Sequence, residues 1–382
     1  MHTHHAVRCG TAMGSSSSRR CRISSGVCVA VALILAFLAC CVACASGAVP
    51  ALYVLGDSQA DVGNNNYLPE SLLRANFPHN GVDYPGGKAT GRFSNGYNFV
   101  DLVASSLGLD SPPPYLSIRN SSNSTIYLKG INFASGGAGV SDLTNKGQCI
   151  SFDEQIERDY SKVHAALVKR LGKRNASTHL GESLFVVAIG GNDIIMQVLF
   201  SPVTELLSTQ KQFISTLADT LKRQLQSLYD LGMRRLFIVG AAPLGCCPLL
   251  REQSPTKACQ AEANSMAATY NDAAAELLRG MAKRHRDMSY AFFDTSTALL
   301  QAIHDPKARG YTEVKAACCG LGVNNAMFLC APDSKYCSNR TTHMFWDLVH
   351  PTEMTSKKLM NVAFNGSAPL VSPINVKELT QC

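Results

Sequence analysis

Short apolar runs that alternate with long amphipathic stretches limit most strongly what this 382-residue chain can fold into. The runs are rich in β-branched and aromatic residues, which is typical of strands buried on both faces of a parallel sheet. They are Ala51–Leu55, the weaker Tyr127–Phe133, Leu184–Ile189, Arg235–Val239 and Tyr290–Phe293. The sequence therefore predicts a sheet of about five parallel strands.

Helical patterns fill most of the intervals between these runs. They cover Asn95–Leu107, Phe152–Leu171, Val203–Leu231, Ala261–Arg286 and Glu353–Phe364. Gly232 follows the longest of them, as expected at the end of a helix. Alternating strands and helices predict an α/β fold, a three-layer α/β/α sandwich. Two stretches, Asn64–Arg92 and Ser111–Ser124, are predicted to be loops.

The first 45 residues differ from the rest of the chain. Residues 1–22 are polar and carry four arginines and no acid, and Val27–Cys44 is an uninterrupted apolar run ending in Ala43-Cys44-Ala45. This order predicts a secretory signal peptide over residues 1–45, followed by a single domain over residues 46–382. A signal anchor is the alternative, because the run approaches the length of a membrane span. No later segment is apolar enough to predict stable membrane insertion.

Composition argues against two classes of protein. A hydrophobic content of 46% with 16% charged residues is typical of a globular chain and not of a disordered one. Without the leader the chain keeps 31 basic and 28 acidic residues, a formal charge of +3. Since no basic stripe with interleaved aromatic residues is present, no nucleic-acid partner is expected.

Nine of the 15 cysteines lie beyond the leader. After secretion most of them are expected to form disulfides, and the odd number leaves at least one free or paired between chains. The group Cys318, Cys319, Cys330 and Cys337 loosely resembles a zinc cluster, but an oxidising compartment favours disulfides. Five Asn-x-Ser/Thr sequons fit the same compartment. They begin at Asn120, Asn123, Asn175, Asn339 and Asn365.

Ser58 follows the first predicted strand by three residues, in Gly56-Asp57-Ser58-Gln59. Ligands of open α/β sheets bind beyond the carboxyl ends of the strands, which is where this serine is expected. At the start of a helix, backbone N–H groups and the helix dipole would favour an oxyanion beside it. Helix capping by Asp57 or Ser58 is the simpler interpretation of this segment alone.

Two further segments follow the second and third predicted strands. Gly130–Gly139 has closely spaced glycines, whose N–H groups can approach a charged ligand atom. It lacks the Lys-Ser/Thr pair of a phosphate loop, and a tight turn is the alternative. Asn192, in Ile189-Gly-Gly-Asn-Asp193, is placed to donate to an oxyanion, with an Asx turn as the alternative.

Asp347 and His350 lie three residues apart, before a helix predicted to begin near Pro351. On a bend, both side chains can face one site. Asp347 would then accept from one imidazole nitrogen, while the other nitrogen takes a proton from Ser58. The coincidence of serine, glycine loop, asparagine and Asp-x-x-His at one edge of the sheet predicts a nucleophilic serine.

These segments resemble the sequence blocks of the GDSL esterase/lipase family of the SGNH hydrolase superfamily, and its plant-type branch most of all. The similarity spans residues 50–380. Its opening blocks are Asp57-Ser58, Asp61-Val-Gly-Asn-Asn-Asn66 and Gly91-Arg-Phe-Ser-Asn-Gly96. The later blocks are Asn132-Phe-Ala-Ser-Gly-Gly137, Ile189–Asp193 and Asp347-Leu-Val-His-Pro-Thr-Glu353, with the cysteine segments Gly240–Cys247 and Ala317–Gly320 between them.

The resemblance implies a flavodoxin-like three-layer fold and a carboxylic ester hydrolase that forms an acyl-enzyme. Ser58 would be the nucleophile, His350 the general base and Asp347 the acid that orients it. No metal or organic cofactor is expected.

The resemblance also implies an oxyanion hole. It would consist of the backbone N–H groups of Ser58 and Gly137, with the adjacent Gly136 as an alternative, and the side chain of Asn192. Gln59 stands where the family has the leucine of its motif, a position without a catalytic role.

The expected partner is an ester, either a lipid, an acylated metabolite or an acetylated polysaccharide, met outside the cell and in the cell wall or apoplast if the source is a plant. An acyltransferase with the same residues is one alternative, and a secreted binding protein without activity is another. The loops Asn64–Arg92 and Asp142–Cys149 are expected to form the substrate wall.

Overall fold

The computed structural model describes residues 49–121, 123–201 and 203–381, without the side chains of residues 203–208. The predicted signal peptide and Cys382 lie outside this part of the chain. Among the described residues, no helix combines the length and the apolar character that crossing a bilayer requires.

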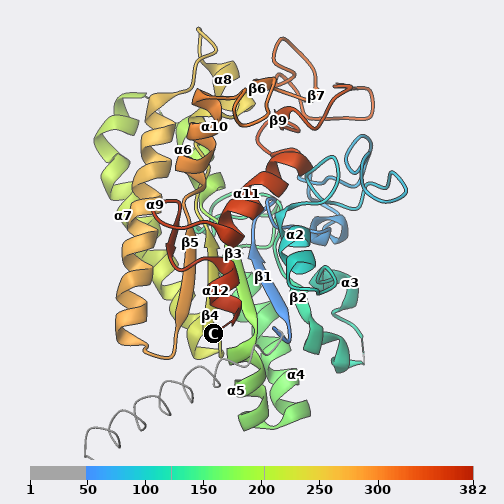
Figure 1. The fold of residues 1–382 in the computed structure, drawn as a ribbon, viewed down its shortest axis with the longest axis vertical. Helices are drawn as coiled ribbons and strands as arrows, with labels where there is room; N and C mark the ends of the chain where they lie inside the picture. The colour runs from blue at the N-terminus through green and yellow to red at the C-terminus, as the bar shows by residue number, and fades with distance from the viewer. Residues whose placement is uncertain (1–48, 122, 202, 382) are drawn as a thin grey trace, which may run out of the picture. The chain divides into compact units, whose positions relative to one another are not determined.

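A six-stranded sheet with the order β10-β5-β4-β3-β1-β2 forms the centre of the domain (Figure 1). Five strands run parallel, which confirms the predicted sheet. They are β1 (Leu52–Gly56), β2 (Gly130–Asn132), β3 (Leu184–Ala188), β4 (Arg235–Val239) and β5 (Ser289–Phe293).

Two features of the sheet were not predicted. The edge strand β10 (Val371–Pro373) pairs antiparallel with β5 and is too short to give a sequence signal. The first half of the predicted run 127–133 belongs to the 3₁₀ helix η2 (Ser124–Lys129), so only its second half is strand.

Helices cover both faces of the sheet, as predicted for three layers (Figure 1). One face packs against α4 (Ser161–Leu171), α6 (Gly191–Phe200), α7 (Val203–Asp230) and α9 (Ala261–Arg284). The other packs against α2 (Phe99–Ser106), α11 (Glu353–Asn365) and α12 (Val376–Gln381). Along β1 the side chains alternate between the layers, with Tyr53 on the first face and Val54 on the second.

Shorter elements complete the domain. The helices are α3 (Tyr115–Ile118), α5 (Lys173–Glu182), α8 (Pro248–Gln253) and α10 (Thr295–His304), with η1 (Asn64–Tyr67), the π-helix η3 (Glu154–Tyr160) and η4 (Leu244–Cys246). Residues 313–345, here called the cysteine-rich segment, contain β6 (Glu313–Ala317), β7 (Cys319–Gly320), β8 (Lys335–Tyr336) and β9 (His343–Phe345).

The cysteines of the described chain form three disulfides. They are Cys246–Cys259, Cys318–Cys337 and Cys319–Cys330. This confirms the expected disulfides and excludes a zinc cluster in the cysteine-rich segment, because all four of its cysteines are paired. Cys149 and Cys247 carry free thiols.

Candidate active site

Ser58 lies in a turn at the carboxyl end of β1. Gly56 ends the strand with a φ of 138°, and a Cβ there would lie 2.1 Å from the carbonyl oxygen of Ala188 on β3, so only glycine fits. The predicted start of a helix at Ser58 is wrong. The Asp61 carboxylate accepts the N–H groups of Gly63 and Asn64, both at 2.7 Å, and this local cap replaces the helical bonds that would follow.

Ser58, His350 and Asp347 form one hydrogen-bonded chain of buried side chains. Oγ of Ser58 lies 2.7 Å from Nε2 of His350, and Nδ1 of His350 lies 2.8 Å from each carboxylate oxygen of Asp347. An ionised carboxylate only accepts, so the imidazole donates through Nδ1 and leaves Nε2 to accept from the serine hydroxyl. This arrangement suits proton transfer from Ser58 to His350.

A tight bend places Asp347 beneath His350, immediately before α11. One carboxylate oxygen of Asp347 accepts the backbone N–H groups of Val349 and His350 at 3.0 and 2.9 Å. Burial by itself raises the pKa of Asp347, but the charge of His350 and these hydrogen bonds outweigh burial and hold the pKa below its ordinary value. Asp347 is therefore ionised and can accept the hydrogen bond from Nδ1 of His350.

The cysteine-rich segment braces this bend. The N–H groups of Cys318 and Cys319 donate to the carbonyl oxygens of Phe345 and Trp346, at 2.9 and 2.7 Å. Trp346, which is fully buried, packs among the cysteines of both disulfides of this segment, and its indole donates to Asn80 at 2.9 Å.

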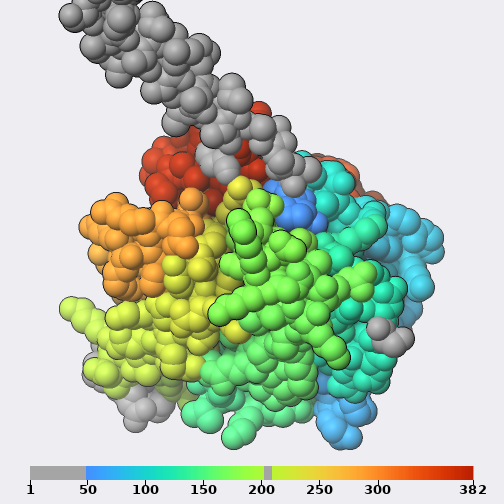
Figure 2. Space-filling view, turned by 90° about the horizontal axis from the view of Figure 1, so that it is seen from below, coloured from blue at the N-terminus to red at the C-terminus, as the bar shows by residue number. Residues whose placement is uncertain are grey.

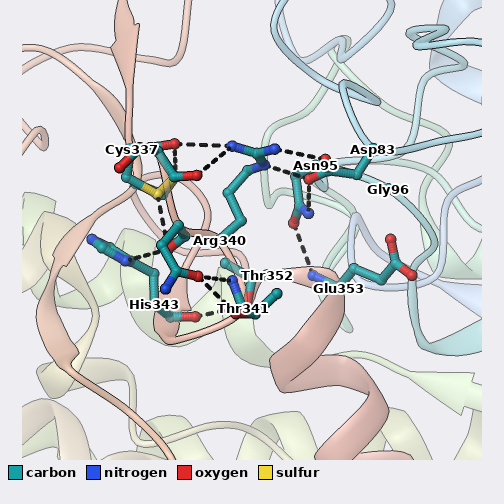
Figure 3. Close-up of polar contacts among 12 residues, drawn as sticks. Asp83, Asn95, Gly96, Cys337, Arg340, Thr341, His343, Thr352 and Glu353 are labelled. Atoms are coloured by element: carbon teal, nitrogen blue, oxygen red, sulfur yellow. Dashed lines mark hydrogen bonds and ion pairs between the residues drawn. A yellow bond between two sulfur atoms is a disulfide. The ribbon is translucent and has the colours of Figure 1, made fainter.

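A polar network connects the same segment to the start of α11 (Figure 3). Arg340 pairs with Asp83 through two contacts of 2.5 and 2.8 Å, and these hydrogen bonds lower the pKa of Asp83. Asn95 donates to Asp83 at 2.7 Å and accepts the backbone N–H of Glu353 at 2.9 Å. Two regions far apart in sequence, residues 83–95 and 340–353, are thereby joined close to His350.

Phe93 was not predicted as part of the site. Its ring lies 4.9 Å from the imidazole of His350, at an angle of 34°. It also lies against Gly136, where a Cβ would approach the ring to 2.6 Å. The only sequence signal was its place in the Gly91–Gly96 block, because no local pattern reveals which residue will cover a distant histidine.

The two candidate glycines differ in what their N–H groups do. Gly136 donates to the Asp61 carboxylate at 3.1 Å. The N–H groups of Gly137 and Ser58 donate to no acceptor among the described residues. Gly137 has a φ of 90°, and Asn145 donates to its carbonyl oxygen at 2.8 Å. This geometry leaves Gly137, and not Gly136, able to donate to a ligand.

Asn192 lies in the first turn of α6, beside the glycine loop. Its side-chain amide donates to the carbonyl oxygen of Ala138 at 2.9 Å, which leaves a second amide hydrogen for a ligand. The alternative Asx turn is not formed. The neighbouring Asp193 accepts the N–H groups of Val140 and Ser141, at 2.8 and 3.0 Å, and so ties the glycine loop to α6.

Buried carboxylates surround the serine. Burial raises the pKa of Asp57 to about 7 and that of Asp61 to about 6, although backbone N–H groups oppose the rise at both residues. Burial also raises the pKa of Asp193. One feature of the sequence indicates these buried acids. Asp57 is adjacent to Ser58 and Asp193 to Asn192, each in a mostly uncharged run.

A cavity begins at Ser58 and Asn192 and passes over the carboxyl ends of β3, β4 and β5 toward α10 and α11. The cavity is partly open to solvent. Its wall is mainly apolar and includes Phe99, Phe237, Phe293, Leu299, Leu359 and Met360. Gln59 also lines it. The loops expected to form the substrate wall contribute none of the lining residues and lie beside Gly137 instead, through Leu73 and Asn145.

Residues 52–362 match the model of the GDSL-like Lipase/Acylhydrolase family. The chain is 39% identical over 340 residues to a GDSL esterase/lipase of Arabidopsis thaliana, covering 87% of this chain and 90% of that one. A second GDSL esterase/lipase of that plant is 36% identical over 324 residues, covering 84% and 90%. A catalytic mutant of an acetylxylan esterase from Geobacillus stearothermophilus is distantly similar in structure, with a TM-score of 0.37, 13% identity and coverage of 82% and 91%.

The family match places this chain among the carboxylic ester hydrolases. It belongs to the GDSL esterase/lipase family, which confirms the resemblance found in the sequence.

Proposed function

We propose that this protein is a secreted serine esterase that hydrolyses carboxylic esters through an acyl-enzyme on Ser58. The observation that carries the proposal is the hydrogen-bonded chain from Ser58 through His350 to Asp347. The backbone N–H groups of Ser58 and Gly137, which donate to no acceptor among the described residues, support the same reaction. Family membership supports ester hydrolysis.

The reaction begins with attack of the Ser58 Oγ on the ester carbonyl carbon, while Nε2 of His350 takes the hydroxyl proton. The carbonyl oxygen becomes an oxyanion facing the N–H groups of Ser58 and Gly137 and the amide of Asn192. His350 then protonates the leaving alcohol as its bond to carbon breaks. A water molecule repeats the sequence, with His350 as base, and releases the acid.

Secretion is part of the proposal. Cleavage after residue 45 would leave the single domain 46–382, whose three disulfides require an oxidising compartment. All five sequon asparagines are exposed, as glycosylation requires. N-terminal sequencing of the secreted product tests the cleavage site, and a leader retained on the protein would contradict it.

The test of catalysis is Ser58→Ala, assayed with p-nitrophenyl butyrate. We expect the turnover number to fall by at least about 10³-fold, because the nucleophile is lost. Ser265→Ala, on the exposed side of α9, is the matched control and should retain wild-type rates. Wild-type turnover in Ser58→Ala would overturn the assignment.

Two additions to this assay separate the alternative functions. An organophosphonate probe should label the wild type and not Ser58→Ala, whereas a binding protein without activity would remain unlabelled. Product analysis with added alcohol distinguishes the two enzymes, because a transferase would form a new ester in place of the free acid.

A further inference from the structure

The exposed large apolar side chains of the described residues gather on one side of the domain. They are Tyr67, Leu72, Leu143, Phe200, Leu321, Val323, Met327, Phe328, Leu329 and Tyr336. The first three belong to the loops after β1 and β2, which approach the carboxyl edge where Leu73 and Asn145 contact Gly137. Single exposed apolar residues scattered over a surface are ordinary, but their confinement to one side is not.

Phe200 and the cysteine-rich segment lie on this same side. The 28-residue helix α7 begins next to Phe200, is about 42 Å long and ends just before β4, so its first turn lies at the carboxyl edge of the sheet. The cysteine-rich segment is bonded to Phe345 and Trp346, immediately before Asp347. Figure 1 shows β6, β7 and β9 above the carboxyl ends of the strands.

The loop of residues 321–329 is the most apolar part of this surface. Val323 is 83% exposed, Phe328 64%, Met327 57% and Leu329 56%. Residues 316–332 contain no Asp, Glu, Lys, Arg or His. Because these side chains are not buried in the core of the domain, their burial in an external apolar phase would be favourable.

The loop is held in shape although its side chains are exposed. The Cys319–Cys330 disulfide closes it, and Cys318–Cys337 anchors its base. Within it, the N–H of Met327 donates to Leu321 at 2.9 Å, and the side chain of Asn325 donates to Ala317 at 2.8 Å. A preformed loop loses little conformational entropy when it binds, so its apolar surface is available for association.

We propose that the carboxyl edge of the domain docks on a lipid surface, with loop 321–329 entering the boundary between headgroups and acyl chains. Exposed Lys315 and Lys335 flank the loop and can reach phosphate headgroups, with Asp333 as the one acid between them. That the lipid also supplies the substrate rests on the proposed function. In that case the apolar cavity at Ser58 would receive an ester directly from the lipid phase.

The opposite end of the domain has a different surface. Figure 2 views that end, where α4 and α5 lie (green). These helices expose Lys169, Arg170, Lys173 and Arg174 there, and no large apolar side chain of theirs is exposed. Docking therefore has a defined orientation, with the candidate active site toward the lipid. Binding to a soluble polysaccharide would not bury the apolar side chains of this loop, so it would not explain their position.

The test compares the wild type with the double variant Met327→Ser, Phe328→Ser. Binding is measured by co-sedimentation with vesicles of phosphatidylcholine and of phosphatidylcholine mixed with phosphatidylserine. We expect the variant to bind at least tenfold more weakly to both, because each substitution removes a large buried apolar group from the bound state. The wild type should bind the mixed vesicles more tightly, since the flanking lysines meet anionic headgroups.

Two controls make the result specific. Lys169→Ser with Arg170→Ser, at the opposite end, should leave binding to phosphatidylcholine unchanged. On dissolved p-nitrophenyl butyrate the Met327→Ser, Phe328→Ser enzyme should match the wild type within twofold, whereas on an ester embedded in vesicles it should be at least tenfold slower. The melting temperature verifies that the variant is folded.

Absence of vesicle binding by the wild type, or equal binding by both proteins, would overturn the proposal. Wild-type dimers that dissociate in the variant, without vesicle binding, would also overturn it and identify a second copy as the occupant. Vesicle binding needs no turnover, so a failure of docking is distinguishable from a failure of the Ser58 assignment.

Discussion

Ser58 and His350 face each other across 2.7 Å, but the segments that carry them are held by different interactions. The nucleophile half of the site, Ser58 with Gly137 and Asn192, is held by buried carboxylates. Asp61 accepts the backbone N–H of Gly136 at 3.1 Å, and Asp193 accepts those of Val140 and Ser141, directly after the glycine loop, at 2.8 and 3.0 Å. Asp61 lies three residues after Ser58 and Asp193 is adjacent to Asn192, so each acid joins its own segment to the distant backbone that follows β2.

The acid–base half, Asp347 with His350, is held from outside the α/β sandwich. Two disulfides, the buried Trp346 and the Arg340–Asp83 pair fix the bend, and all belong to or contact the cysteine-rich segment. The nucleophile half therefore depends on the protonation of buried acids, and the acid–base half depends on the oxidation of cysteines.

The largest effect is expected for Asp347→Asn. An asparagine cannot hold the imidazole in the tautomer that accepts from Ser58, so the turnover number should fall about 10³–10⁴-fold. The assay is p-nitrophenyl butyrate hydrolysis, with Asp333→Asn, at an exposed position of the cysteine-rich segment, as the matched control. A loss of less than tenfold would remove Asp347 from the mechanism.

In the nucleophile half, Asn192→Ala should lower the turnover number about 10²–10³-fold, because one donor to the oxyanion is lost. The Michaelis constant should change little, since this donor acts on the transition state. Steady-state kinetics measures both, and Asn361→Ala, exposed on α11, serves as the control. An effect confined to the Michaelis constant would indicate substrate binding alone.

Removing the disulfide that anchors the cysteine-rich segment tests the acid–base half. Cys318→Ser with Cys337→Ser opens a loop of 19 residues and should lower the free energy of unfolding by about 3 kcal/mol. Urea unfolding measures this loss, and the turnover number should fall with it.

The matched control is Cys246→Ser with Cys259→Ser, which opens a loop of 13 residues. It should lower stability by a similar amount but leave turnover closer to the wild type. Equal losses of turnover in both variants would contradict a specific brace on Asp347 and His350.

The smallest effect concerns pH and the nucleophile half. The pKa of Asp57 is raised to about 7 in the folded state, against about 3.9 in an unfolded chain. Between these values the folded state binds more protons, so the contribution of Asp57 to stability falls as pH rises from about 4 to about 7.

The measurement compares melting temperatures of the wild type and Asp57→Asn at pH 5 and pH 7.5. Relative to the variant, the wild type should be less stable at the higher pH. A pH-independent difference would mean that Asp57 does not retain its proton in the folded protein.

Much of the fold follows from local pattern. The run Arg235–Val239 has the same bounds as β4, and the pattern over 203–231 matches α7 to within one residue. The prediction of a strand over 127–133 was wrong in its first half. Residues 127–129 resemble a strand in sequence but belong to the 3₁₀ helix η2, and the strand begins only at Gly130. The helix predicted at Ser58 failed because a side chain, Asp61, took the N–H groups that a helix would use.

The candidate site residues could be predicted from the sequence where they belong to ordered motifs that follow strands. Ser58, Asn192 and the Asp-x-x-His pair all follow the rule that ligands bind at the carboxyl edge. The sequence missed Phe93, because its contact with His350 joins positions more than 250 residues apart. The wall of the cavity was missed for the same reason.

Residue type and spacing along the chain were enough to predict the parallel sheet, the family and the candidate site residues. The tertiary structure was needed to find that Asp61 accepts the N–H of Gly136, to pair the cysteines, and to bring the exposed apolar side chains to one edge. These features depend on where an N–H points and which distant segments meet, and packing of the whole domain sets both.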